Sequence, residues 1–222
     1  MEFHNQLDAL NSTFVTSAVE VADAMPELVA GYIEGDTAVI ERSQELSIRT
    51  GRACEDIEDH GFILLAREAP VAGDLRRLVA ILRMTTNIDR AASLLAHVCA
   101  TVDRYDPREL RDDARQQLVE LGERSAGVYR SGVDAWRQGD ALAVTEIDDA
   151  DEAVDQLRDR LIETAATADM ASDAVLVLGQ MGRYFERIAD HGVSIARDAA
   201  FVATGQRVRT GKRRANYGRS ID

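Results

Sequence analysis

The 222-residue sequence is poor both in residues that break helices and in residues that favour strands. It contains three prolines (Pro26, Pro70 and Pro107), and aromatic residues make up only 5% of it, although hydrophobic residues of all kinds make up 45%. Because proline interrupts helices and aromatic side chains favour strands, this composition indicates long helices and almost no strand. A chain of this length and apolar content can bury a substantial core.

Cysteine and long apolar runs are also scarce. Cys54 and Cys99 stand far apart without paired spacing, which argues against a disulfide framework and against a thiolate metal site. No uninterrupted apolar run approaches the roughly 18 residues of a membrane-spanning helix, and residues 1–6 lack the basic and then apolar order of a signal peptide. We therefore expect a cytoplasmic protein without a membrane span.

Positive charge is in short supply outside the C-terminal segment. The chain has 26 basic and 39 acidic side chains, and residues 205–222 hold six of the bases and one of the acids. Residues 1–204 therefore carry a net charge of −18. Such a body repels phosphodiester backbones, so we expect no nucleic-acid binding there, and acidic surfaces favour cations or basic protein partners instead.

Apolar residues recur at three- and four-residue steps through nearly the whole chain, and five breaks interrupt this period. The breaks lie at residues 35–36, 69–70, 105–107, 139–140 and 167–172. The pattern predicts an all-α protein of six helices, each long enough for an antiparallel bundle with short connections. The expected helices are 5–34, 37–66, 71–103, 108–138, 140–166 and 171–204.

Two of these breaks repeat each other. An aromatic residue followed by a Gly-Asp turn occurs at Tyr32 to Asp36 and again at Trp136 to Asp140, at an offset of 104 residues. The economical interpretation is an internal repeat of two tandem antiparallel three-helix bundles. We expect the first bundle at residues 1–104, the second at 105–204, and a basic disordered tail at 205–222.

Carboxylates accompany the apolar face of the last two expected helices. In residues 140–166 an aspartate follows each of three members of the apolar series Ile147, Ala150, Val154, Leu157 and Leu161. Asp151 with Asp155, and Glu186 with Asp190, are pairs one helical turn apart. Four converging carboxylates repel one another unless a cation lies between them, and Mg, Ca, Mn, Fe or Zn would suit oxygen ligands. The plainer alternative is an ordinary charged flank, neutralised by nearby arginines.

Three segments carry motifs that point to one protein family. Residues 185–191 (Phe-Glu-Arg-Ile-Ala-Asp-His) look like the E-R-I-[GA]-D signature of the PhoU family. Residues 64–76 contain Pro-Val-Ala-Gly-Asp-Leu-Arg, which is similar to its P-V-A-x-D-L-R pattern, and residues 151–155 resemble its D-x-x-[VI]-D motif. The twofold repeat of three-helix bundles is also what this resemblance implies.

The resemblance implies multinuclear metal sites built from E/D-x-x-x-D pairs. Carried over to this chain, the metal ligands are Asp151, Asp155, Glu186 and Asp190, with Fe, Mn, Zn or Mg as the candidate ions. The first half departs from the pattern, because Ser47 and Gly51 replace two of the acids, and its third helix keeps Asp89 but has Ser93 in place of the other acid. We expect one site in the second half and a weak or absent one in the first.

The resemblance further implies a non-enzymatic regulator of phosphate uptake and phosphate-starvation signalling. Its partners would be the ATPase subunit of the phosphate transporter and a sensor histidine kinase. The oligomeric state stays open, and a homodimer is one option. One alternative is a helical scaffold without metal. The other is a carboxylate-bridged metal oxidase, which the lack of Glu-x-x-His pairs among the four histidines disfavours.

Overall fold

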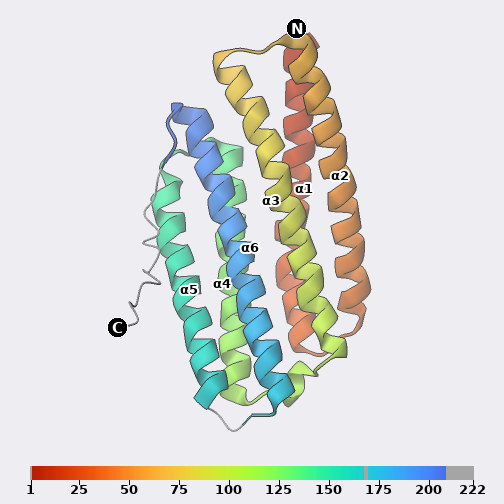
Figure 1. Cartoon of the computed structure of the whole chain (residues 1–222), viewed down its shortest axis with the longest axis vertical. Coiled ribbons are helices and arrows are strands. Elements are labelled where there is room, and N and C mark those ends of the chain that lie inside the picture. The colour runs from red at the N-terminus through yellow and green to blue at the C-terminus, as the bar shows by residue number, and fades with distance from the viewer. Residues whose placement is uncertain (1, 168–169, 209–222) are drawn as a thin grey trace, which may run out of the picture.

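Six α-helices make up most of the chain in the computed structural model, which describes residues 2–167 and 170–208 (Figure 1). The helices are α1 (Glu2–Ile33), α2 (Ala38–Glu68), α3 (Ala72–Ala100), α4 (Asp112–Gln138), α5 (Ala143–Thr167) and α6 (Ser172–Thr204). Two short 3-10 helices, η1 (Thr101–Asp103) and η2 (Pro107–Glu109), connect α3 to α4. None of the helices in these ranges is long and apolar enough to cross a membrane. The prediction of an all-α fold with six long helices is confirmed.

The helices form two antiparallel three-helix bundles that lie side by side (Figure 1). α2 packs against α1 and α3 in the first bundle, and α5 packs against α4 and α6 in the second. The bundles meet where α1 packs on α4 and α3 packs on α6, so α2 and α5 occupy the two outer edges. The molecule therefore has one broad face made by α3 and α6 and an opposite face made by α1 and α4.

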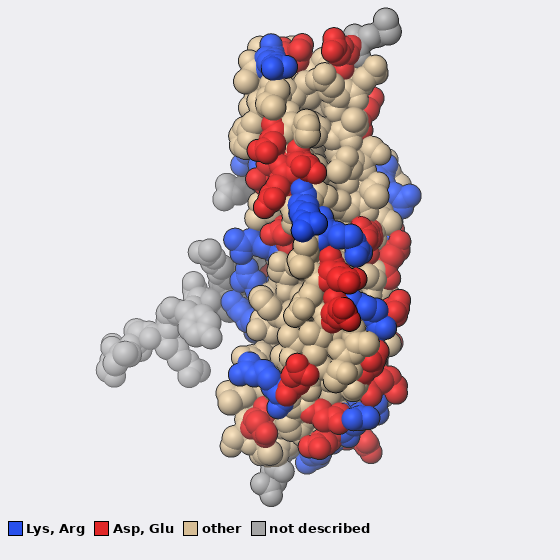
Figure 2. Space-filling view, turned by 90° about the vertical axis from the view of Figure 1, so that its right-hand side faces the viewer, with Lys and Arg blue, Asp and Glu red and all other residues tan. Residues whose placement is uncertain are grey.

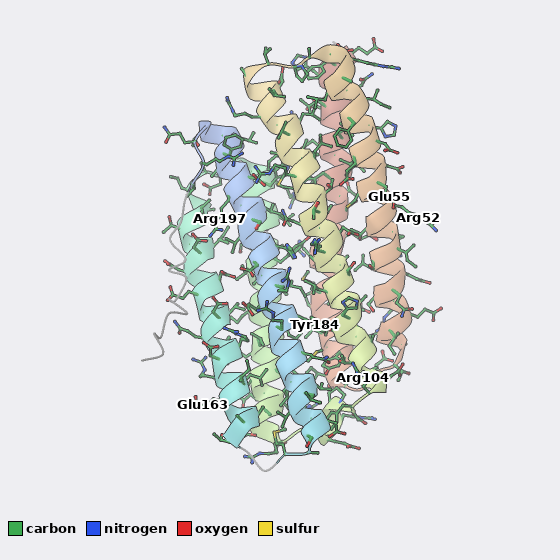
Figure 3. The ribbon with its side chains drawn as sticks, in the orientation of Figure 1. Arg52, Glu55, Arg104, Glu163, Tyr184 and Arg197 are labelled. Atoms are coloured by element: carbon green, nitrogen blue, oxygen red, sulfur yellow. The ribbon has the colours of Figure 1, made fainter. Side chains whose placement is uncertain are left out.

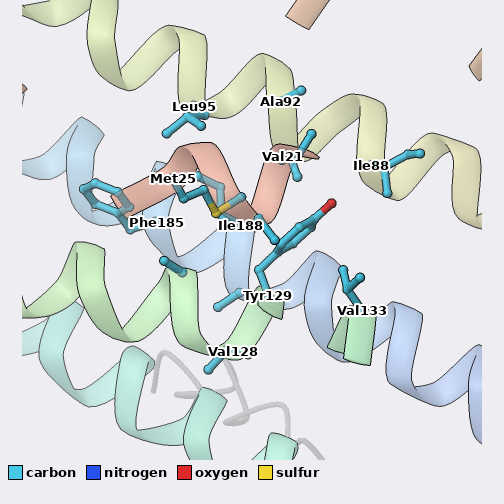
Figure 4. Packing of buried hydrophobic residues seen from close by; sticks show 14 of the residues in the cluster. Val21, Met25, Ile88, Ala92, Leu95, Val128, Tyr129, Val133, Phe185 and Ile188 are labelled. Carbon is cyan, nitrogen blue, oxygen red and sulfur yellow. The ribbon is translucent and has the colours of Figure 1, made fainter. Parts of the chain in front are cut away.

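One apolar core runs through both bundles. Figure 4 shows its centre, where Met25 of α1, Leu95 of α3, Tyr129 of α4, and Phe185 and Ile188 of α6 come together. Each of these side chains is buried. Because this core spans the junction of α1 and α3 with α4 and α6, apolar burial joins the two repeats into one packed unit.

The repeated Gly-Asp turns have the same structure in both halves. Gly35 and Gly139 both adopt a left-handed backbone, with φ of 71° and 64°, which ends the preceding helix. The carboxylate of the aspartate that follows accepts a backbone N–H two residues on, from Ala38 in one turn and from Leu142 in the other. This shared chemistry explains why the sequence repeats at these positions.

The connection between the bundles differs from the prediction. The third helix was expected to end at residue 103 and the fourth to begin at 108, whereas η1 and η2 occupy this stretch and α4 begins at Asp112. The Asp106 side chain accepts the backbone N–H of Arg108 and pairs with its guanidinium at 2.6 Å, which closes the tight turn at Pro107. The predicted tail lies outside the described residues from position 209 onward.

α4 and α6 touch through their backbones. A Cβ at Gly132 would overlap the backbone of Gly192, and a Cβ at Gly192 would fall 2.5 Å from the Cα of Tyr129. Only glycine allows such an approach, so this pair fixes how closely α4 and α6 pack. The close packing places α6, which carries two of the four predicted ligands, firmly within the second bundle.

Candidate functional site

The four predicted ligands lie on α5 and α6, which pack against each other. Asp151 is 1% exposed, and Asp155, Glu186 and Asp190 are half-buried. The expectation that Ala150 belongs to the apolar face and Asp151 to its flank is wrong, because Ala150 is exposed and Asp151 is buried. The buried face of α5 instead runs through Ile147, Asp151 and Val154, as the helical period of 3.6 residues requires.

Arginines reach into this acidic region from both helices. Arg158 of α5 and Arg183 of α6 each place a guanidinium nitrogen 3.6 Å from Oε2 of Glu186. The Arg158 stem crosses α6 at Gly182, where an added Cβ would lie 3.1 Å from Cγ of Arg158. About three turns away along the two helices, Arg197 of α6 donates to Asp148 of α5 at 2.9 Å, and Figure 3 shows Arg197 directed toward α5.

The carboxylates do not form a ready metal site in this arrangement. Within residues 2–167 and 170–208, no group of three or more histidine, cysteine, aspartate or glutamate side chains is arranged to hold a metal ion. Hard cations favour such oxygen ligands, but Glu186 is shared with two guanidinium groups. The positive charges of Arg158 and Arg183 would oppose a metal ion beside Glu186, and metal binding at this place stays a prediction.

The first bundle brings the equivalent positions together with different chemistry. Oγ of Ser47 on α2 lies 3.3 Å from Oγ of Ser93 on α3. A Cβ added at Gly51 on α2 would lie 3.4 Å from Oδ1 of Asp89 on α3. The repeat therefore preserves the facing of these positions, while hydroxyl groups and a glycine replace three of the four carboxylates.

His191, next to the predicted ligand Asp190, forms a hydrogen bond across the junction between the bundles. Its Nδ1 lies 3.0 Å from Oδ1 of Asn87 on α3, so the ring donates this hydrogen bond. Burial, together with the nearby Arg187 and Arg90, lowers the pKa of His191 to about 4, although the charge of Asp190 acts to raise this pKa. The imidazole is therefore neutral at physiological pH and acts as a structural hydrogen-bonding group.

A second buried acid lies in α6 and is not among the predicted site residues. Asp198 of α6 is 7% exposed and pairs with Arg83 of α3 at 3.4 Å. Burial raises the pKa of Asp198, whereas Arg83 and Arg207 oppose that shift. Its position three residues after the buried Ile195 was the available signal, because an aspartate there must face the junction of the bundles.

The surface on the α2 side mixes both charge signs. Figure 2 shows acidic and basic side chains interspersed with wide uncharged areas on this side of the molecule. Arg52 and Glu55 point away from the bundle there (Figure 3). On the broad face, Tyr184 of α6 lies with its ring centroid 5.7 Å from that of His97 of α3, across the junction.

The comparison with known protein families matches each bundle separately. The PhoU domain matches residues 14–102 and again residues 118–199. The chain belongs to the PhoU family. The prediction drawn from residues 64–76, 151–155 and 185–191 is therefore confirmed, and so is the tandem repeat.

Two mycobacterial proteins are similar over most of their length. Phosphate-specific transport system accessory protein PhoU homolog 1 of Mycobacterium leprae is 29% identical over 210 residues, which cover 91% of this chain and 93% of that protein. PhoU homolog 2 of Mycobacterium tuberculosis is 28% identical over 210 residues, covering 91% of this chain and 97% of that protein.

Solved structures of PhoU proteins share the fold. The phosphate transport system regulatory protein PhoU from Streptococcus pneumoniae superposes with a TM-score of 0.84 at 19% identity, covering 94% of this chain and all of that chain. PhoU from Pseudomonas aeruginosa gives 0.85 at 20% identity over 92% of this chain and all of that chain. The mycobacterial relatives are named as accessory proteins, and the Streptococcus pneumoniae protein is named as a regulatory protein.

Proposed function

We propose that this PhoU protein is a cytoplasmic accessory protein of a phosphate transport system and a negative regulator of the phosphate-starvation response. It acts as an adaptor between the ATPase subunit of the phosphate transporter and a sensor histidine kinase. The observation that carries this proposal is the match of the PhoU domain to both bundles, together with relatives named as accessory proteins of phosphate-specific transport.

The architecture suits an adaptor. Two bundles side by side give broad opposite faces, one from α3 and α6 and one from α1 and α4, so two partners can be engaged at once. The −18 charge of residues 1–204 favours partners with basic surfaces. One core joins the two bundles, so both faces belong to a single packed unit.

The metal-binding part of the proposal assigns an Fe, Mn, Zn or Mg ion to Asp151, Asp155, Glu186 and Asp190. Two observations support it: hard oxygen donors gather on two packed helices, and one of them, Asp151, is buried. When bound, the ion supplies charge neutralisation between α5 and α6. The chain's own Arg158 and Arg183 do this for Glu186 without an ion.

The arginine pairing also favours a second candidate, in which the same surface docks partners without metal. Glu186 already has two cationic neighbours, so the acidic region can persist without a bound ion. In the first candidate, removing a carboxylate weakens partner binding because the metal ion is lost. In the second candidate, any effect on partner binding is independent of metal. Chelator treatment weakens partner binding in the first candidate and leaves it unchanged in the second.

A starvation reporter in the native host tests the regulatory role. Secreted phosphatase activity is measured under phosphate-replete growth, with and without the gene for this chain. The proposal predicts that the reporter switches on without the gene and off again when the wild-type gene is restored. A reporter that stays off in the deletion strain contradicts the role of negative regulator.

A further inference from the structure

A groove crosses the face opposite the broad α3/α6 face, where α1 of the first bundle meets α4 of the second. Its volume is about 670 Å³, and small and apolar residues form its floor. Ala22, Val29 and Ala126 are buried there, whereas Ala30 is exposed and Val119 is half-buried. We call this feature the α1/α4 groove.

Gly127 of α4 lines this groove without any packing reason inside the chain. An added Cβ would have no heavy atom within 4 Å, so alanine would fit. Gly122, five residues earlier, is different, because a Cβ there would lie 2.7 Å from Val29 and 3.3 Å from Phe185. Glycine within a helix destabilises it relative to alanine, and no contact inside the chain requires glycine at position 127. The open space over Gly127 therefore needs an explanation.

Pro26 gives the groove a second unusual feature. It lies inside α1 and lines the groove together with Ala22, four residues before it. Because proline has no N–H, the helical hydrogen bond to the Ala22 carbonyl cannot form. The groove wall therefore includes a backbone acceptor that has lost its usual helical donor, beside a glycine that permits close approach.

The charges at the rim indicate the kind of occupant. Glu34, Asp112 and Glu123 are exposed acids that line the groove, and within residues 2–167 and 170–208 none of them takes part in an ion pair. Of the two arginines of the rim, Arg130 pairs with Asp23. Arg115 donates to the neutral carbonyl of Ile33 at 3.3 Å and keeps its charge, so the three acids outnumber it. The charge that remains for a ligand is negative.

We infer that the α1/α4 groove docks an amphipathic helix of a protein partner, with small apolar residues on its inner face and basic residues along one edge. The apolar floor suits such a helix, Gly127 lets its backbone come close, and the acidic rim pairs with its basic edge. The inference rests on the proposed function, which supplies the two partners to be tried: the sensor kinase and the transporter ATPase subunit.

Binding measurements with matched variants test the inference. Full-length sensor kinase in nanodiscs and the ATPase subunit, both from the native host, are titrated with the full chain. Gly127→Leu fills the groove and is expected to weaken binding of at least one partner by about tenfold. Gly179→Leu is the control, because Gly179 of α6 also has no atom within 4 Å of an added Cβ but lies outside the groove.

A second pair of variants tests the rim. Glu123→Lys is expected to weaken binding and to flatten its dependence on salt, because it removes an attraction to the basic edge. Glu120→Lys, on the same helix but outside the groove, should leave binding within about twofold of wild type. A photo-reactive residue at Ala30 should crosslink to a helical, basic-edged peptide of the partner.

The outcomes separate the groove from the adaptor role. If wild type binds a partner and both Gly127→Leu and Glu123→Lys bind it equally well, the groove is not the docking site. The adaptor role is then unaffected. A crosslink from Ala30 to a second copy of the chain or to residues 209–222 also overturns the inferred occupant. Failure of wild type to bind either partner overturns both the groove and the adaptor.

Discussion

Arg158 of α5 reaches across to Glu186 of α6, with Nη1 and Oε2 3.6 Å apart, at the place where the sequence predicts metal ligands. The pair is mostly shielded from solvent, since the two side chains are 24% and 15% exposed. Arg183 contacts the same carboxylate oxygen from within α6. The arginines and a metal ion are therefore competitors for Glu186.

This competition predicts that Arg158→Gln raises metal affinity. The substitution removes one of the two cations beside Glu186, so a divalent ion meets less opposing charge. Calorimetric titration of the metal-free protein with Mn²⁺ should show binding about tenfold tighter than in wild type. Arg160→Gln, at an exposed position of the same helix, should bind like wild type. Absence of binding in both Arg158→Gln and wild type contradicts the metal assignment.

Gly132→Ala is predicted to destabilise the protein severely. The added methyl group would overlap the backbone of Gly192, so α4 and α6 would have to move apart. Overpacking of this kind costs about 1–3 kcal/mol, and more where backbone must move. Urea denaturation should show a lower midpoint than in wild type. An unchanged midpoint would mean that the two helices are not in backbone contact.

Gly127→Ala is predicted to change stability in the opposite direction. The alanine meets no neighbour and improves the helix, so the free energy of unfolding should rise by about 0.5–1 kcal/mol. The same urea titration measures it, with Gly179→Ala as a second glycine whose added Cβ is also free of contacts. A loss of stability in Gly127→Ala would show that the groove closes on itself in solution.

Asp198→Asn is predicted to stabilise the protein at neutral pH, with a benefit that fades in acid. Burial raises the pKa of Asp198 above that of the unfolded chain, so the native state favours the protonated form. The carboxyl therefore contributes most to stability below its unfolded pKa, and this contribution is lost as pH rises through the folded value.

Thermal melts from pH 7 downward check this prediction. The melting temperature of Asp198→Asn should exceed that of wild type at pH 7, and the two should converge as wild-type Asp198 takes up its proton. A variant that melts lower than wild type at pH 7 would mean that the Arg83 pair outweighs the cost of burying the charge.

The sequence predicted the repeat well because the repeat is encoded locally. Gly35 and Gly139 each need a left-handed backbone, and the aspartate after each one accepts a backbone N–H two residues on, so the pattern is visible in a few adjacent residues. The start of α4 was predicted four residues early, because the side chain of Asp106 and Pro107 form a tight turn that apolar periodicity does not register.

Contacts between helices were less accessible to sequence reasoning. The facing of α5 and α6 acids follows from their spacing, but the path of Arg158 over Gly182 depends on how the two helices pack. The α1/α4 groove depends on packing between the bundles as well, and the sequence analysis contains no prediction of it. Such features arise from tertiary packing, which a single sequence encodes only indirectly.

The most direct test of the central claim is the starvation reporter in strains that lack this chain alone, or lack both this chain and its sensor kinase. A negative regulator that acts through the kinase predicts high phosphatase activity in phosphate-replete medium for the single deletion and low activity for the double deletion. High activity in both strains would contradict action through the kinase, and low activity in the single deletion would contradict negative regulation itself.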